Sequence, residues 1–292
     1  MSITARAKAI KLNHILVATD LSRASLWSLP YVSAIAGEYD STIYIGHVIP
    51  LWVYTAARPQ SFDIIEKECR EHAQAELDRF SAEIKSQNIN VQTLLSEGDV
   101  GIVIPDWCKQ HDIDLIAVGT TGRSGVRKLF LGSVAEEIIR AAERPVLTVG
   151  RASSRRRSGP SRSILCATDF SKDSLLCASY ALSMASHCRA RLIVLTVIDE
   201  REEPESRASV VERLRALISN NSTLTSELEF LVASGNPAKK ILEIAREHSA
   251  DLITVGVRGA GGFARAASHF GSTAHDIIVG SSCPVLTVRA SK

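Results

Sequence analysis

The chain has 292 residues, which at about 150 residues per domain predicts two domains. Hydrophobic residues make up 45% of the sequence and charged residues 23%; these values are typical of globular proteins and exclude a disordered or collagen-like chain. Because 34 Lys and Arg stand against 32 Asp and Glu, the net charge is only +2. The chain therefore has no overall positive field, and we expect no nucleic-acid partner.

No stretch of the sequence approaches the roughly 18 apolar residues of a membrane span, and no apolar core follows the basic residues Arg6, Lys8 and Lys11. We therefore expect a cytoplasmic protein without membrane contact. The six cysteines include no CxxC pair and no Cys–His spacing of a zinc site. Reduced, buried thiols are the favoured interpretation, and redox or metal chemistry is the weaker alternative.

Short apolar runs in the first half predict five strands, in chain order Ile15–Ala18, Thr42–Ile49, Val91–Leu95, Leu115–Val118 and Val146–Val149. Between them, apolar spacings of three and four predict helices over 62–84, 102–107 and 134–141, and Pro105 should kink or loosen the second of these. The strands are apolar on both faces, which favours a parallel sheet covered on both sides. The order predicts a doubly wound α/β domain with right-handed crossovers.

The second half repeats the first. Residues 132–149 and 271–288 share ten of eighteen positions, including an unbroken PVLTV. HILVATDLS around Asp20 corresponds to SILCATDFS around Asp169, and DLIAVGTTG corresponds to DLITVGVRG. The offset between copies changes from 149 to 137 and then to 139 residues, which indicates insertions and deletions in loops. The repeated strands run from Ile164–Ala167 through Leu192–Ile198 to Val285–Val288.

A basic segment separates the copies. Residues 151–163 hold five arginines, five serines, one glycine, one proline and no acid, a composition typical of a linker. Contact with RNA or an anionic membrane is the weaker alternative, because no aromatic residue lies among the arginines to stack a base. We therefore predict one domain over 1–150, a linker over 151–160 and a second domain over 161–292.

Ligands of such sheets bind beyond the carboxyl ends of the strands, where the winding direction reverses. Asp20 follows the first strand, and the glycine-rich run 119–133 follows the fourth. Its glycines would let the backbone approach an anion, and the helix starting near Ser133 would offer free N–H groups. Arg123, Arg127 and Lys128 add positive charge. This pattern predicts a phosphate site, with Asp20 accepting hydrogen bonds from a base or ribose or reaching a magnesium shell.

A purely structural interpretation stays open for each of these residues. The glycines could make only a strand-to-helix turn, Ser133 could be only an N-cap, and Asp20 could cap the following helix through Ser22. Neither GxxxxGK[ST] nor a GxGxxG after the first strand occurs.

The residues of the glycine-rich run resemble a known family. The spacing G-x2-G-x9-G-[ST], met by Gly119, Gly122, Gly132 and Ser133 after DLIAVG, resembles the signature of the universal stress proteins. Both halves resemble the family over nearly their whole lengths, so the sequence is similar to a tandem universal stress protein. The resemblance implies two five-stranded parallel sheets of order 3-2-1-4-5, the adenine nucleotide alpha hydrolase-like arrangement. It also implies binding of ATP, with or without Mg²⁺, in the members that keep the signature.

Carried over by position, the resemblance implies adenosine and phosphate contacts in each copy. In the first copy the implied residues are Ala18, Thr19, Asp20, Val48, Val118, Gly119, Thr121, Gly122, Gly132, Ser133 and Val134. In the second copy they are Ala167, Thr168, Asp169, Val197, Val255, Gly256, Arg258, Gly259, Gly271, Ser272 and Thr273. Eleven residues, not nine, separate Gly259 from Gly271, so occupancy of the second site is less strongly predicted.

The sequence shows no nucleophile with a base, no metal cluster and no paired carboxylates. His47 is expected to be structural, and slow ATP hydrolysis stays open. We predict an ATP-binding protein with a regulatory role in the stress response and no dedicated catalysis. The alternatives are an interaction scaffold that has lost nucleotide binding and, more weakly, an ATP-using enzyme.

The fifth strands suggest how the copies associate. Pro145–Val149 and Pro284–Val288 should lie at sheet edges, where unpaired backbone groups invite another strand. The resemblance implies dimerisation through this strand. We therefore expect an intramolecular pseudo-dimer through the two fifth strands, with further homo-oligomerisation left open.

Overall fold

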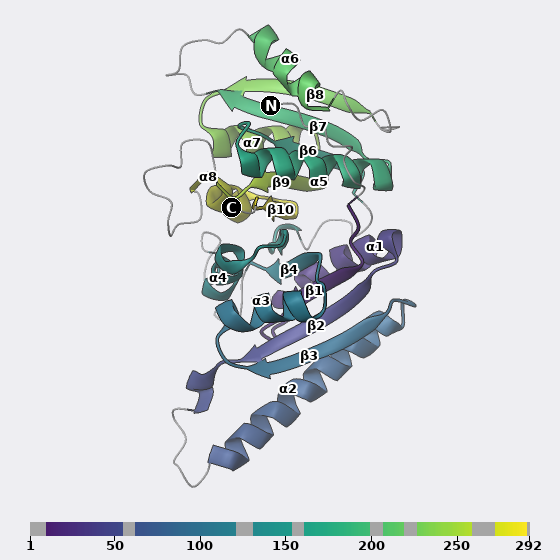
Figure 1. Ribbon diagram of the computed structural model, residues 1–292, viewed down its shortest axis with the longest axis vertical. Coiled ribbons are helices and arrows are strands. Elements are labelled where there is room, and N and C mark those ends of the chain that lie inside the picture. Colours follow the sequence, from purple (N-terminus) through teal and green to yellow (C-terminus); the bar gives the residue numbers. More distant parts are fainter. Residues whose placement is uncertain are drawn as a thin grey trace. The chain divides into compact units, whose positions relative to one another are not determined.

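The computed structural model describes residues 10–54, 62–120, 131–153, 161–198, 207–218, 227–258 and 272–290. These residues form two compact units, one spanning Leu12–Arg151 and the other Ala152–Lys292 together with the N-terminal segment that ends at Lys11. We call them the first and second domains. Figure 1 labels the helices and strands of both domains.

The first domain is a five-stranded parallel sheet of order β3-β2-β1-β4-β5. Its strands are β1 (His14–Ala18), β2 (Thr42–Ile49), β3 (Val91–Glu97), β4 (Leu115–Gly119) and β5 (Val146–Val149). Its helices are η1 (Ser25–Ser28, 3-10), α1 (Leu29–Tyr39), η2 (Leu51–Tyr54, 3-10), α2 (Phe62–Lys85), α3 (Val100–Gln110) and α4 (Ser133–Ala141). The predicted strand order 3-2-1-4-5 is confirmed.

The second domain repeats this order, because β8-β7-β6-β9-β10 corresponds strand by strand to the first sheet. Its strands are β6 (Ser163–Ala167), β7 (Arg191–Ile198), β8 (Leu228–Ser234), β9 (Leu252–Gly256) and β10 (Val285–Val288). Its helices are α5 (Lys172–Cys188), α6 (Arg207–Ile218), α7 (Pro237–Glu247) and α8 (Ser272–Gly280).

Helices cover each sheet in pairs. In the first domain α1 packs on β1 and β2, α2 packs on β2 and β3, and α3 packs on α4; in the second, α5 packs on β6 and β9, and α7 packs on α8 (Figure 1). Right-handed crossovers place the helices before β3 on one face and those after it on the other. The two-sided cover explains why the central strands are apolar throughout, with Ile15, Leu16 and Val17 at 0% exposure.

Three features of the chain go beyond the sequence prediction. Helix α3 runs through Pro105 and continues to Gln110. The 3-10 helix η1 follows β1 after the loop 19–24, and η2 follows β2 after Pro50. The N-terminal segment belongs to the second domain, where the Ile10 N–H donates to Ser183 Oγ at 3.0 Å. The greater part of the predicted linker, residues 154–160, lies outside the described residues.

Candidate functional site

The candidate site of the first domain lies where β1 and β4 end side by side. In the register of the sheet, Ala18 lies between Gly46 of β2 and Val118 of β4. From β1 the chain passes to β2 on one side of β1. It later returns to β4 on the other side of β1. This reversal is the switch point at which α/β sheets bind ligands. The loop that follows β1 and the residues after β4 therefore meet at the predicted position.

Thr19 and Asp20 shape the turn after β1. The buried hydroxyl of Thr19 lies 2.6 Å from Ser25 Oγ and accepts the Leu21 N–H at 2.9 Å. Half-buried Asp20 accepts the Ser22 N–H through Oδ1 at 3.0 Å. These bonds hold Leu21 in the left-handed region, with φ 64°. Asp20 therefore has a structural contact in this turn, but it does not cap the following helix, because the N-cap of η1 is Ala24 and no described side chain caps it.

The second domain builds the same turn from matched residues. Thr168 Oγ1 lies 3.0 Å from Ser174 Oγ and accepts the Phe170 N–H at 3.1 Å. Asp169 Oδ1 accepts the Ser171 N–H at 3.0 Å, and Phe170 has φ 61°. Because both domains keep this strained turn, the local sequence TD-x-S determines it independently of the loop after the fourth strand.

In each domain a side chain of the second strand contacts the carbonyl oxygen of the threonine that follows the first strand. His47 Nδ1 lies 2.8 Å from Thr19 O, and at the matched position the Thr196 hydroxyl donates to Thr168 O at 2.7 Å. His47 therefore has the structural contact that we expected of it. The next residue along, Val48 or Val197, is 8% exposed in the first domain and half-buried in the second. Both valines lie at the adenosine end predicted for each strand.

The first glycine of each signature is required by internal packing. A Cβ on Gly119 would lie 2.6 Å from Ala24 O and 2.8 Å from Ser25 Cα. A Cβ on Gly256 would lie 2.8 Å from Ser174 N. The colliding backbone atoms lie at the start of η1 in the first domain and in the first turn of α5 in the second, so the glycine lets the start of this helix lie against the fourth strand.

The end of the glycine loop in the first domain returns to the strand that precedes it. The Gly132 N–H donates to Thr120 O at 2.9 Å, and Gly132 is the N-cap of α4. Glu136 makes the first helical bond, from its N–H to Gly132 O at 2.9 Å. The N–H groups of Ser133, Val134 and Ala135 come before this first bond and so have no acceptor within the helix. Ser133 and Val134 are exposed, and no described side chain caps the helix.

The N-terminus of α4 is suited to bind an anion. The positive end of the helix dipole lies at the carboxyl edge of β4, together with N–H groups that have no partner among the described residues. By contrast, α5 is capped by Ser171, whose hydroxyl accepts the Ser174 N–H, and α7 is capped by Asn236. In the second domain Ser272 and Thr273 begin α8, as Ser133 and Val134 begin α4. Seven predicted loop residues lie outside the described part of the chain: Thr121, Gly122, Arg123, Arg127, Lys128, Gly259 and Gly271.

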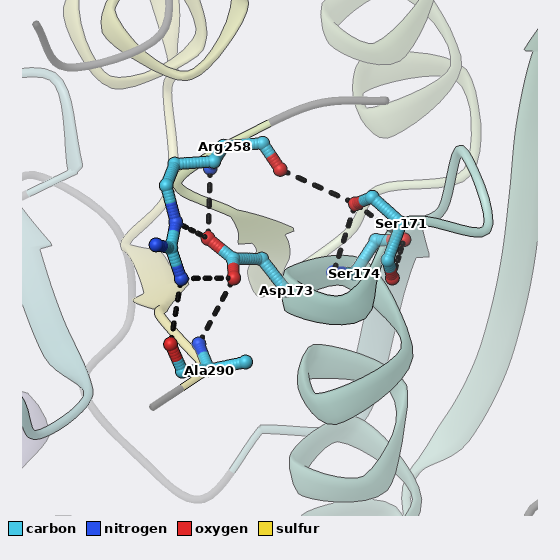
Figure 2. Close-up of polar contacts among 5 residues, drawn as sticks. All are labelled: Ser171, Asp173, Ser174, Arg258 and Ala290. Carbon is cyan, nitrogen blue, oxygen red and sulfur yellow. Dashed lines mark hydrogen bonds and ion pairs between the residues drawn. The ribbon is translucent and has the colours of Figure 1, made fainter. Parts of the chain in front are cut away.

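Sequence reasoning missed an ion pair in the second domain (Figure 2). Asp173, in the first turn of α5, has a side chain only 3% exposed and pairs with Arg258, two residues beyond β9. Hydrogen bonds to Asp173 raise the pKa of Arg258 above its ordinary value, against the effect of burial. The resemblance assigns Arg258 by position to ribose and phosphate, but its guanidinium is directed at Asp173 instead (Figure 2). The signal in the sequence is Asp173 itself, a carboxylate where the first copy has Ala24.

Within the described ranges, no group of three or more His, Cys, Asp or Glu side chains is arranged to hold a metal ion. Over the same part of the chain, no helix combines the length and apolar character needed to cross a bilayer. The six cysteines are free thiols in this structure.

Comparison with known proteins gives the class to which this fold and site belong. The model of the universal stress protein family matches residues 11–150 and again 160–289. The chain therefore belongs to the universal stress protein family and carries two of its domains in tandem.

Individual relatives agree with this assignment. A universal stress protein of Mycolicibacterium smegmatis is 26% identical over 292 residues, covering 94% of this chain and 96% of its own. One from Methanocaldococcus jannaschii is 30% identical over 136 residues, covering 46% of this chain and 80% of its own. The crystal structure of a universal stress protein from Archaeoglobus fulgidus covers 96% of this chain and 99% of its own, with a TM-score of 0.78 at 24% identity, and so shows the same fold.

Proposed function

We propose that the first domain binds an adenine nucleotide, ATP in the first instance, and that occupancy regulates the protein in a stress response without dedicated catalysis. The observation that carries this proposal is the start of α4. The first N–H groups of this helix have no partner among the described residues, and the bond from Gly132 N–H to Thr120 O holds the helix start next to the end of the fourth strand. Such a helix start binds phosphate through backbone groups, without a metal cluster or a Walker lysine.

The neighbouring turn supplies the other half of the site. Asp20 lies after β1, and Ala18 is adjacent to Val118 in the sheet, so the aspartate lies close to the end of β4. The half-buried carboxylate of Asp20 can accept hydrogen bonds from ribose hydroxyls or from the amino group of the base. The apolar side chain of Val48, at the end of the next strand, suits the face of a purine.

The competing proposal is an interaction scaffold with a universal stress fold and no nucleotide. It is favoured by one observation, that Thr19, Asp20 and Gly119 all have internal structural roles. Those roles explain these three residues, but within the described ranges no side chain caps the start of α4, where Ser133 is exposed. We therefore prefer the nucleotide-binding proposal.

The test begins with mass spectrometry of any nucleotide released from the purified full chain, followed by calorimetry with ATP and Mg²⁺. Gly132→Val should weaken ATP binding at least about tenfold, because the branched side chain crowds the helix start that would hold the phosphates. Gly37→Val is the matched control, since a Cβ at Gly37 in α1 meets nothing within 4 Å. Equal ATP affinity in both variants would remove the phosphate site from the first domain.

We also propose that the fifth strands of the two domains pair edge to edge in solution. Each is a four-residue strand with the sequence VLTV, bonded to the fourth strand of its own sheet. Cleavage at the arginines of residues 151–163 in protein that starts at Leu12, followed by size exclusion under native conditions, tests the pairing without the N-terminal segment that also joins the fragments. Domains that separate after cleavage would contradict it.

A further inference from the structure

In the first domain the start of α3 is capped by a side chain of the neighbouring helix. Asp99 is the N-cap residue of α3, but its side chain makes no capping hydrogen bond. The Gly101 N–H donates instead to Glu137 Oε1 of α4, at 3.1 Å. Because α3 and α4 pack against each other (Figure 1), Glu137 connects its own helix to the start of the other.

The carboxyl groups of Asp99 and Glu137 lie close together beside Gly101. A Cβ added to Gly101 would lie 2.7 Å from Glu137 Oε1 and 3.1 Å from Asp99 Oδ1, so the two oxygens border the space that a larger residue would fill. The two side chains also share a hydrogen bond. Ionised carboxylates are acceptors only, so this bond requires a proton on one of them. We call these two side chains the carboxyl pair.

The proton of the carboxyl pair resides on Glu137. This side chain is half-buried, whereas Asp99 is exposed. Burial, the charge of Asp99 and the hydrogen bond to Asp99 all raise the pKa of Glu137, and the bond from the Gly101 N–H opposes them. Glu137 is therefore a group that gains or loses a charge at a fixed place in the first domain.

The other charged residues of the two helices are distant from the carboxyl pair or paired with each other. In α3, Asp106 and Lys109 lie in the second half of the helix. In α4, Glu136 forms an ion pair with Arg140. The strands before and after α4, β4 and β5, contain no ionisable side chain. Within the described ranges, Asp99 is thus the charged neighbour that acts on Glu137.

The second domain has no carboxyl pair. Its residues at the matched positions are Asn236, Ala238 and Asp276. Asn236 caps α7 with its own side chain, which accepts the Lys239 N–H at 3.0 Å. Asp276 has a side chain that is 65% exposed and lies 3.3 Å from His275. The carboxyl pair therefore occurs in the domain whose α4 carries the proposed phosphate site.

Glu137 lies near that phosphate site. Ser133 and Glu137 are four positions apart in α4, so they share one face of the helix, with Cβ atoms about 5–6 Å apart. Helical side chains also lean toward the N-terminus of their helix. A negative charge on Glu137 would therefore lie close to the N–H groups that hold the phosphates, and it would repel them.

We propose that Asp99 and Glu137 share a proton that controls nucleotide binding by the first domain. With the proton bound, the start of α4 holds the phosphates tightly, and loss of the proton as the pH rises weakens their binding. The inference rests on the proposed function for its ligand and adds a regulator to that site. Because coupling between two bound species is reciprocal, nucleotide binding also draws a proton onto the carboxyl pair.

Calorimetry of the full chain with ATP and Mg²⁺ at a series of pH values tests the inference. Glu137→Gln is the informative variant, because it keeps an acceptor for Gly101 and cannot ionise. Since both proteins meet the same ligand at each pH, the titration of ATP itself cancels in the ratio of their dissociation constants. Wild type and variant should bind alike near pH 4.5, and wild type should bind about three- to tenfold more weakly than the variant near pH 8.

Two further variants distinguish the carboxyl pair from a general effect of charge. Glu136→Gln is the matched control, because it removes a carboxylate from the same helix and leaves the carboxyl pair intact; the wild-type fall in ATP affinity with pH should remain. Asp99→Asn removes the charge that raises the pKa of Glu137, so the fall should move to lower pH. Asparagine is the residue that caps α7 at the matched position, which makes this variant usable if Glu137→Gln does not fold.

The outcomes separate the inference from the proposed function. A ratio of dissociation constants that stays constant over the pH range would overturn the inference and leave ATP binding in place. An Asp99→Asn profile that coincides with that of wild type would also overturn it. Absence of ATP binding at every pH would contradict the proposed function, and the inference with it.

Discussion

Arg258 donates through Nε and Nη2 to the two carboxylate oxygens of Asp173, at 2.9 and 2.8 Å, and so joins the end of β9 to the first turn of α5. Such a fork-to-fork pair combines charge with fixed geometry. One partner is almost fully buried, with a side chain 3% exposed, and the other is 34% exposed. The pair therefore differs in its energetics from the exposed ion pairs on the helices.

Removing the arginine should destabilise the chain. Arg258→Thr removes both side-chain hydrogen bonds of the arginine to the buried carboxylate of Asp173 and is expected to lower the free energy of unfolding by about 2–4 kcal/mol. The double variant with Asp173→Ala, which gives the second domain the residues of the first, should recover at least half of that loss. Chemical denaturation of the four proteins of this double-mutant cycle measures the coupling. Arg140→Thr, which breaks the exposed pair with Glu136, is the control and should cost about 0.5 kcal/mol or less.

Gly119 should tolerate no side chain. Gly119→Ala places a Cβ 2.6 Å from Ala24 O, a backbone atom that cannot move without shifting the turn after β1. We expect a loss of about 1–3 kcal/mol in the free energy of unfolding, measured by thermal or chemical denaturation. Gly37→Ala, at a helical glycine with open space, should be neutral or stabilising by up to about 1 kcal/mol. Similar effects of the two substitutions would contradict the close approach.

Glu137 should make the stability depend on pH. Burial, and next the neighbouring charge of Asp99, raise the pKa of Glu137 above its ordinary value of 4.5, although its Oε1 accepts the Gly101 N–H. Because the folded state binds this proton more tightly than the unfolded state, the group favours folding at low pH, and that contribution is lost as the pH rises through the raised pKa.

The variant Glu137→Gln should abolish that dependence. It keeps an acceptor for Gly101 but cannot ionise, so the free energy of unfolding of wild type relative to Glu137→Gln should fall as the pH rises above 4.5. Denaturant titrations from pH 4 upward measure this difference. A relative stability that rises with pH over the same range would show that Glu137 is instead stabilised as a carboxylate.

The thiols should divide into two classes of reactivity. Cys69 and Cys188 are half-buried, whereas four others are buried: Cys108, Cys166, Cys177 and Cys283. Burial raises the pKa of Cys108 to about 11, so little of it is thiolate at neutral pH. In the folded chain a thiol-specific disulfide reagent should modify Cys69 and Cys188 first, and the remaining four only after unfolding. Modification of Cys108 at the same rate as Cys69 would contradict this.

The architecture was predictable because its signals are local and repeated. The runs that begin at Ile15, Thr42 and Leu115 are too uniformly apolar for a sheet with one solvent-exposed face. In the structure they form buried parallel strands. The strand order followed from the resemblance to the family rather than from periodicity, and it is confirmed in both sheets. The start of α4 at Ser133 was likewise visible as a Gly-Ser step before a helical pattern.

The contacts that the sequence did not predict join distant residues. Asp173 and Arg258 are 85 positions apart, and no sequence motif around either residue indicates that the two are in contact. The packing of Gly119 against Ala24 and Ser25 also brings together segments that are far apart in the chain, so the sequence left open whether this glycine serves a turn or a ligand. The signature identifies the loop, whereas the contacts of its individual residues require the folded chain.

The N-terminal segment gives the second domain a discontinuous sequence. Ile10 bonds to Ser183, so the polypeptide contributes to the second domain, builds the whole of the first, and then returns to complete the second. A fragment that starts at residue 152 would therefore lack part of its own domain, and cleavage between residues 151 and 163 alone would leave that part attached to the other fragment. Protein that starts at Leu12 is the cleaner starting material for separating the domains.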